Sequence, residues 1–194
     1  YPLAHAALGL IALAAGEVDF ALASRLMRSP FIAGAETEFA RRARLDAKLR
    51  EELPARVTLA RIVGAIEGSP QSRGRFEALF NYASGHLAGM QSPHAWARHF
   101  SALLDAAGFP GERTLDSTEF QTRAKFYETL GEFALLERVL PRMACAQALA
   151  RLRRLCTDTL FQPESNDAPV QILGILESAG LEFDCLWVSG LTDD

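Results

Sequence analysis

The sequence has few cysteines, no apolar run long enough to cross a membrane, and no excess of positive charge. Its three cysteines, Cys145, Cys156 and Cys185, show no C-x-x-C spacing, so we expect reduced thiols in a cytoplasmic protein. The longest apolar run, Pro2–Ala15, would form a helix about 21 Å long, short of the ~30 Å hydrocarbon core. We therefore expect no membrane partner, and we expect this segment to be a helix buried in a larger helical core. A net charge of −4 argues against nucleic-acid binding through bulk charge alone.

Motifs that would supply chemistry are also missing. The chain has no G-x-x-x-x-G-K-[ST] loop to cradle phosphates, so it cannot hold a complete nucleotide site. His94 and His99 are five residues apart, a spacing that does not put them on one helical face, and we expect no metal site. Asp184, Asp193 and Asp194 are not followed by E-x-K, and a two-metal nuclease needs its carboxylates and a lysine in one cleft. We expect no catalytic residue and no cofactor within this chain.

What the sequence does contain, up to about residue 160, is helical periodicity. Leu59, Ile62, Val63 and Ile66 recur at the spacing of one amphipathic face. Two helix starts carry capping signals: Ser92 before a proline, and Asp116 or Ser117 followed by Glu119 as in a capping box. The expected helices are Pro2–Ala15, Val18–Arg28, Glu36–Glu52, Thr58–Glu67, Arg75–Leu87, Pro93–Ala107, a long helix from Asp116 or Ser117 to the break at Pro141, and Met143–Leu160.

Near the end of the chain, the hydrophobic pattern changes from one typical of helices to one typical of strands. Val170–Leu176 and Cys185–Val188 are short apolar runs on either side of Gly180, typical of neighbouring buried strands in an α/β sheet. We therefore predict a mainly α protein, with an all-helical domain over 1–161, a polar linker over 162–169, and the first strands of a sheet over 170–194. Because the chain starts without Met and stops just after a predicted strand, we expect it to be a fragment of a larger protein.

Residues 174–183 carry a family resemblance. They resemble the fifth conserved motif of superfamily 1 DNA helicases of the UvrD/RecB/AddB type, T-x-H-x-S-K-G-L-E-F. Ser178 and the run from Gly180 to Phe183 match this motif. Gly174 stands in place of the Thr, Leu176 of the His and Ala179 of the Lys. The polar half of the motif is thus lost, which indicates a degenerate, inactivated helicase.

Other segments resemble the same family. Ala21–Ile32 (ALASRLMRSPFI) is similar to a segment of the helical insertion in AddB-like proteins, and Arg42–Arg50 follows it at a familiar distance. Gly108–Gln121 and Trp187–Leu191 resemble the "probable DNA repair protein" group of inactivated helicase–exonucleases. The resemblance implies that residues 1–161 are the helical insertion that precedes the fifth motif in the second RecA-like, P-loop NTPase-like domain. It also implies a nuclease domain C-terminal to the helicase-like part in the parent.

The resemblance suggests contacts for three residues near the C-terminus. The Glu equivalent to Glu182 reaches the ribose of ATP in active relatives, so nucleotide contact is implied only for the parent protein. Alternatively, Glu182 caps a turn or pairs with a basic neighbour. Ser178 and Gly180 could offer a hydroxyl and a backbone N–H to a DNA phosphate. The alternative is a tight turn in which Gly180 supplies a positive φ.

Two sets of basic residues could follow a DNA backbone. Arg41, Arg44 and Lys48 are three and four residues apart and share one helical face, and Arg151 and Arg154 do the same in the last helix. The alternative for both sets is a merely solvated helix surface.

Three hypotheses of function remain open. The first is a non-catalytic region of a helicase-like exonuclease involved in DNA repair, which contributes to DNA binding and scaffolding in its parent, with a helicase or nuclease partner subunit. The second is a helical protein-interaction module without DNA affinity. The third is part of an active ATP-dependent DNA helicase, with ATP and Mg²⁺ bound in the parent, which requires the changes at Leu176 and Ala179 to be tolerated.

Overall fold

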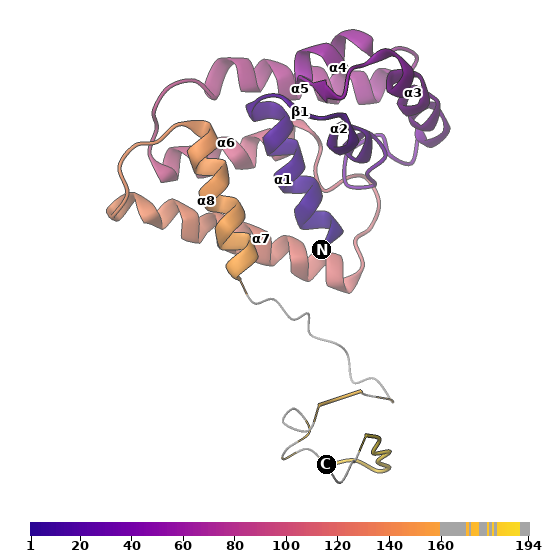
Figure 1. Ribbon diagram of the computed structural model, residues 1–194, viewed down its shortest axis with the longest axis vertical. Coiled ribbons are helices and arrows are strands. Elements are labelled where there is room, and N and C mark those ends of the chain that lie inside the picture. Colours follow the sequence, from indigo (N-terminus) through magenta and orange to yellow (C-terminus); the bar gives the residue numbers. More distant parts are fainter. Residues whose placement is uncertain (160–169, 171, 175–177, 179, 181, 191–194) are drawn as a thin grey trace. The chain divides into compact units, whose positions relative to one another are not determined.

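The structure is a computed structural model that describes residues 1–159, 170, 172–174, 178, 180 and 182–190. Its contacts divide the chain into two units, Tyr1–Pro163 and Glu164–Asp194. The first unit is helical (Figure 1). Its α-helices are α1 (Pro2–Ala15), α2 (Phe20–Met27), α3 (Phe39–Glu52), α4 (Leu59–Ala65), α5 (Pro70–His86), α6 (Pro93–Ala106), α7 (Ser117–Leu135) and α8 (Cys145–Asp158), with a 3-10 helix, η1 (Leu136–Arg138).

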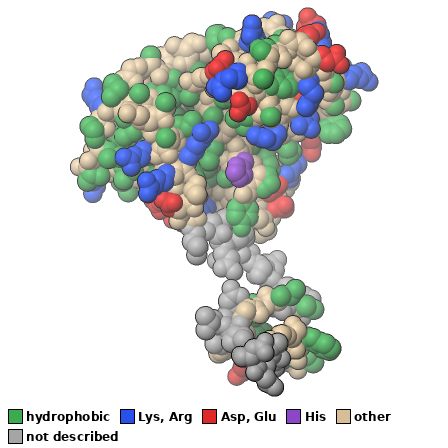
Figure 2. All heavy atoms as spheres, viewed as in Figure 1, with side chains coloured by type: hydrophobic (Ala, Val, Ile, Leu, Met, Phe, Trp, Pro, Cys, Tyr) green, Lys and Arg blue, Asp and Glu red, His purple; other side chains and the backbone are tan. Residues whose placement is uncertain are grey.

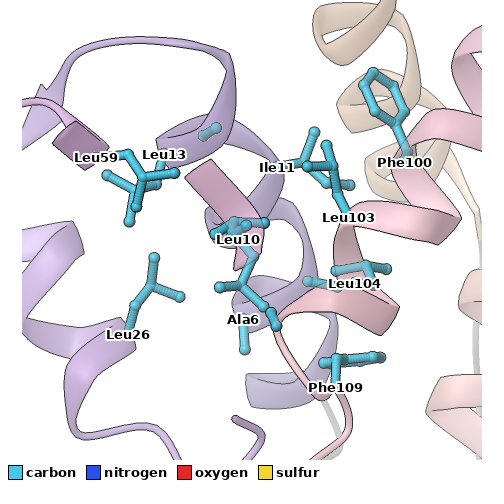
Figure 3. Packing of buried hydrophobic residues seen from close by; sticks show 14 of the residues in the cluster. Ala6, Leu10, Ile11, Leu13, Leu26, Leu59, Phe100, Leu103, Leu104 and Phe109 are labelled. Carbon is cyan, nitrogen blue, oxygen red and sulfur yellow. The ribbon is translucent and has the colours of Figure 1, made fainter. Parts of the chain in front are cut away.

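Helix α1 is the centre of the helical unit (Figure 1). Figure 3 shows Leu10 and Leu13 of α1 turned towards Leu26 and Leu59, while Ile11 lies beside Leu103 and Phe100 of α6. The prediction that this all-round apolar segment is buried in a helical core is confirmed, because α1 packs on α2, α5, α6, α7 and α8. In the described part of the chain, no helix is long and apolar enough to cross a membrane.

The capping signals predicted from the sequence are also confirmed. The Ser92 side chain accepts from the N–H of Ala95 at the start of α6. Asp116 and Glu119 form the reciprocal capping box at the start of α7. The buried stripe of α6 continues into α7 through the stacked rings of Trp96, Phe100 and Phe133. Local sequence signals thus define the two helices that make the most extensive helix–helix contact of this unit.

Some element boundaries differ from the predicted ones. Helix α5 begins at Pro70 rather than Arg75, because proline fits the first helical position, where its missing N–H costs nothing. A hairpin that the periodicity does not predict pairs β1 (Val18–Asp19) with β2 (Arg56–Val57), in antiparallel register with Val18 opposite Val57. This pairing fixes the chain at two places: β1 lies directly before α2, and β2 lies shortly before α4.

The start of an α/β sheet predicted for residues 170–194 is not observed in the described residues of that segment. Cys185–Val188, the predicted second strand, is not in a strand, and neither are the described residues of Val170–Leu176, which are 170 and 172–174. Residues 171, 175 and 176 and all of the predicted linker 162–169 lie outside the described residues. A strand is stable only where a neighbour satisfies its backbone N–H and C=O groups. The prediction of a mainly α protein is confirmed, and the RecA-like sheet is not.

Candidate nucleic-acid interface

A buried arginine organises the turn that follows α2. Arg42 of α3 is 3% exposed, and its Nε donates to the carbonyl oxygen of Met27 at 2.6 Å. Its two Nη groups donate to the carbonyls of Leu26, Ser29 and Ile32 at 3.4 Å. No carboxylate accepts a hydrogen bond from this guanidinium among residues 1–159, and its burial lowers the pKa of Arg42. One side chain thus fixes four carbonyls of the Leu26–Ile32 segment.

A buried carboxylate at the start of α3, that of Glu38, accepts hydrogen bonds from the first turn of α5. Glu38 is 3% exposed and accepts from the backbone N–H groups of Gln71 and Ser72 and from the Ser72 hydroxyl, at 2.7 to 3.0 Å. Burial alone raises the pKa of Glu38, but these hydrogen bonds lower it below its ordinary value. The negative charge faces the first N–H groups of α5, which is the favourable end of the helix dipole.

The loop after α6 packs closely against the same turn. A Cβ on Gly111, which has a φ of +97°, would lie 2.3 Å from the carbonyl oxygen of Pro30. Oε1 of Glu112 accepts from the N–H of Gly34 at 2.8 Å. Arg113 pairs with Glu119 and lies 5.3 Å from the centroid of the Phe31 ring. Glycine at position 111 is therefore required for this approach of two backbones.

Three segments that resemble the repair-protein family thus meet in space: Ala21–Ile32, Arg42–Arg50 and Gly108–Gln121. Beside this junction is an open hollow of about 380 Å³, lined by Ala33, Gly34, Pro70, Gln71, Gly74, Arg75 and Glu112. The hollow holds one cation and one carboxylate among small residues, and it has no arrangement of a nucleophile with a base.

The three basic residues predicted on one face of α3 lie on its exposed side. Arg41, Arg44 and Lys48 are all exposed, whereas Arg42 and Leu45 between them are buried. Arg41 and Arg44 form no ion pair within the described part of the chain. Nζ of Lys48 is 2.7 Å from Oε2 of Glu67 and 3.8 Å from Oε1 of Glu52. Its charge is therefore compensated by α4 and the end of α3, and only the two arginines remain open to an anion.

Charge is unequally distributed along the chain. All twenty Lys and Arg residues lie within residues 1–159, together with seventeen of the 24 Asp and Glu residues. The helical part therefore has a net charge of +3, and the last 35 residues have a net charge of −7. Figure 2 shows Lys and Arg side chains spread over the visible face of the helical unit. The helical unit is therefore basic, although the chain as a whole has a net charge of −4.

The residues predicted from the helicase-like motif lie in the second unit. Gly180 has a φ of +85°, which fits the turn interpretation of this position. The backbone N–H of Ser178 donates to the carbonyl of Gly174 at 3.0 Å. Glu182 is exposed. In α8, Arg154 pairs with Asp158 at 3.4 Å, and Arg151 is exposed.

A histidine cluster that sequence spacing does not reveal lies between α5 and α6. Nδ1 of His99 is 2.9 Å from the Tyr82 hydroxyl, and its Nε2 is 3.0 Å from Oε1 of Gln91. The His86 ring stacks on Tyr82 at 4.2 Å and lies 5.5 Å from His99. Burial, His86 and Arg98 lower the pKa of His99. Among the described residues, no group of three or more His, Cys, Asp or Glu side chains could hold a metal ion.

Two of the three thiols are poor nucleophiles. Burial raises the pKa of Cys145 and of Cys156 to about 11. Cys185 is exposed, and all three cysteines are free. The described cysteines thus offer no covalent chemistry in the helical unit.

The helical unit thus presents a surface with an excess of positive charge over residues 1–159. No family model, no curated protein and no solved structure matches this chain.

Proposed function

We propose that this chain is a non-catalytic region of a helicase-like DNA repair protein, and that it binds DNA and acts as a scaffold in that protein. The observation that carries this proposal is the charge distribution, which concentrates every Lys and Arg residue in the helical unit. The junction of Ala21–Ile32, Arg42–Arg50 and Gly108–Gln121 supports it, because the segments that resemble the repair-protein family are also those that depend on one another structurally.

In this proposal the C-terminal segment is covered by other parts of its assembly. Ile172 is 97% exposed, Trp187 is 93% exposed and Leu186 is 68% exposed. Apolar residues of this kind mark a surface that another chain or domain covers. In this proposal, these apolar side chains are covered by further strands of a RecA-like domain of the same protein, or by a helicase or nuclease partner subunit. ATP and Mg²⁺, if they are bound in the parent, need a phosphate-binding loop that this chain lacks.

The experiment is a titration of the 194-residue chain into labelled DNA, followed by fluorescence anisotropy at several salt concentrations. Binding through phosphate contacts weakens linearly with the logarithm of the salt concentration. We expect such a decline, and we expect no ATP hydrolysis with or without DNA. DNA affinity that is absent at low salt, or that salt leaves unchanged, rejects the proposal. ATP hydrolysis would favour the active-helicase hypothesis instead.

A helical protein-interaction module is the second candidate. It is favoured by apolar side chains exposed on the helical unit: Met90 at 55%, Leu135 at 61% and Val139 at 76%. This hypothesis predicts no DNA affinity at any salt concentration, so the same titration separates the two candidates.

A further inference from the structure

Two arginines, Arg28 directly after α2 and Arg50 of α3, share one buried carboxylate. Nε of Arg28 lies 3.2 Å, and Nη2 of Arg50 lies 3.0 Å, from Oδ2 of Asp46. Both Nη2 groups also donate to the hydroxyl of Ser24, at 3.3 Å from Arg28 and 2.8 Å from Arg50. The Asp46 side chain is only 7% exposed, whereas those of Arg28 and Arg50 are 53% and 55% exposed. The inner edges of the two guanidinium groups are therefore fixed, and the side chains remain half open to solvent.

The remaining nitrogens of this pair are available to a ligand. Within residues 1–159, Nη1 of Arg28 makes no hydrogen bond, and neither do Nε and Nη1 of Arg50. The Arg50 guanidinium is further held over the ring of Phe20, 5.9 Å from its centroid. A guanidinium that is already positioned loses less conformational freedom when it binds an anion. The pair is thus preorganised for phosphate oxygens.

A third arginine leaves this region clearly positive. Arg25 precedes Arg28 by three residues, so the two lie on the same side of α2. Arg25 is exposed and forms no ion pair in the described part of the chain. Helix α2 contains no acidic residue, and within residues 1–159 Asp46 is the single carboxylate bound to the pair. Three guanidinium groups against one carboxylate leave an excess of two positive charges.

An exposed aromatic residue lies on the same flank of α3. At 100° per residue, Phe39, Ala43 and Arg50 fall within about 40° of one line along the helix. Phe39 is 74% exposed, which is unusual for a large apolar ring, and Ala43 leaves the surface between it and Arg50 low. Eleven residues at 1.5 Å each separate Phe39 from Arg50 by about 16 Å. This distance spans a few nucleotides.

We propose that Arg25, Arg28, Phe39 and Arg50, together the α2–α3 surface, bind a short stretch of single-stranded nucleic acid. The guanidinium groups contact the phosphates, and Phe39 stacks on an unpaired base. Aromatic platforms beside a basic track are how proteins hold single strands without sequence preference, and a duplex offers no free base face to such a ring. This inference rests on the proposed DNA binding and assigns it to the side of α3 opposite Arg41, Arg44 and Lys48.

The experiment compares variants of the 194-residue chain in binding a labelled oligothymidylate of about 30 nucleotides. Arg25→Gln removes one phosphate contact, so we expect affinity to fall about fivefold at 0.1 M salt, and the slope of log K against log salt to shrink by about 0.7. Phe39→Ala removes a stacking contact, so we expect affinity to fall about tenfold with an unchanged slope. Neither substitution removes an ion pair of the described structure. Arg138→Gln, an exposed arginine of η1, is the matched control, and we expect it to bind as the unsubstituted chain does.

The outcomes separate this inference from the proposed function. Unaltered affinity and slope in both variants overturn the α2–α3 surface, while salt-dependent binding by the unsubstituted chain still supports the proposed function. Equal losses from Arg25→Gln and Arg138→Gln show diffuse attraction and also overturn the site. Tighter binding of a duplex, with no effect of Phe39→Ala, overturns the single-strand assignment. No binding by the unsubstituted chain rejects both proposals.

Discussion

Arg42 and Met27 are fifteen residues apart in the sequence, and the Nε of Arg42 donates to the Met27 carbonyl at 2.6 Å, within the core. The arginine is buried, yet it satisfies backbone carbonyls and binds no carboxylate directly. Loss of the guanidinium removes the side-chain donor of the Met27, Ser29 and Ile32 carbonyls, whereas the Leu26 carbonyl keeps the backbone N–H of Ser29 at 3.0 Å. A buried carbonyl without a donor is costly, so the turn depends strongly on this side chain. A side chain of α3 therefore fixes the Leu26–Ile32 turn from one side, while the loop at Gly111 packs against Pro30.

Replacement of this side chain should destabilise the protein strongly. We expect Arg42→Met to lower the free energy of unfolding by about 3 kcal/mol, because it removes the only side-chain donor for these carbonyls in the described part of the chain. Arg42→Lys should recover part of the loss, since an ammonium group keeps the charge but cannot reach all four carbonyls. Urea denaturation followed by circular dichroism measures both. The exposed neighbour Arg41→Met should change stability by less than about 0.5 kcal/mol, and an equal effect at both positions would contradict this account.

The carboxylate of Glu38 should make stability depend on acid pH. Its pKa is lowered in the folded protein, so the stabilisation is fully present above the ordinary pKa near 4.5 and is lost as the pH falls through the lowered value. We expect Glu38→Gln to reduce stability at neutral pH by about 1 to 2 kcal/mol and to flatten its decline below pH 4.5. Glu36→Gln, at an exposed position nearby, is the control. Parallel pH profiles for the unsubstituted protein and Glu38→Gln would show that Glu38 is not the group responsible.

The elements that sequence patterns predict correctly are those with local causes. The capping box of Asp116 and Glu119 joins residues three apart, and the core position of α1 follows from its all-round apolar composition. The pairing of Val18 with Val57 could not be predicted from the sequence, because two-residue strands are too short to show a periodicity and the two partners lie 39 residues apart. The face formed by Arg41, Arg44 and Lys48 could be predicted from spacing, but the pairing of Lys48 with Glu67 could not, because it depends on where α4 packs.

In the C-terminal segment, the sequence pattern predicts strands that the described residues do not form. A run of β-branched and large apolar residues indicates a strand only if a neighbouring strand is present, and Cys185–Val188 has none among the described residues. The predicted pair of strands therefore gives no support to the proposed helicase-like ancestry, which rests only on the sequence resemblance. Within the helical part, the α2–α3 surface could not be predicted, because Arg25 and Arg28 lie in and directly after α2 whereas Arg50 lies in α3. Sequence periodicity does not show how these two segments pack.

Two glycines should respond in opposite directions to the same substitution. Gly111→Ala places a Cβ 2.3 Å from the Pro30 carbonyl at a φ of +97°, so we expect a loss of about 3 kcal/mol in the free energy of unfolding. Gly131→Ala lies inside α7 with nothing within 4 Å, so we expect a gain of up to about 1 kcal/mol from helix propensity. Thermal unfolding of the two variants checks both signs. A neutral Gly111→Ala would show that the loop after α6 is free to move away from the turn.

The cluster around His99 should lose stability in mild acid. Gln91 uses its Nε2 to donate to the carbonyls of His86 and Ala88, so its Oε1 accepts from Nε2–H of His99, and Nδ1 of the neutral ring accepts from the Tyr82 hydroxyl. Burial, His86 and Arg98 lower the pKa of His99, so its contribution is present above the ordinary value of 6.5 and is lost as the pH falls through the lowered value. Titration of the histidine ring protons by NMR should place His99 below 6.5, and His99→Gln should lessen the loss of stability between pH 7 and pH 5. His94→Gln, at an exposed position of α6, identifies one of the other resonances and should leave that loss unchanged. A His99 pKa above 6.5 would mean that the ring binds a proton more readily in the folded state, contrary to a network that is complete only when the ring is neutral.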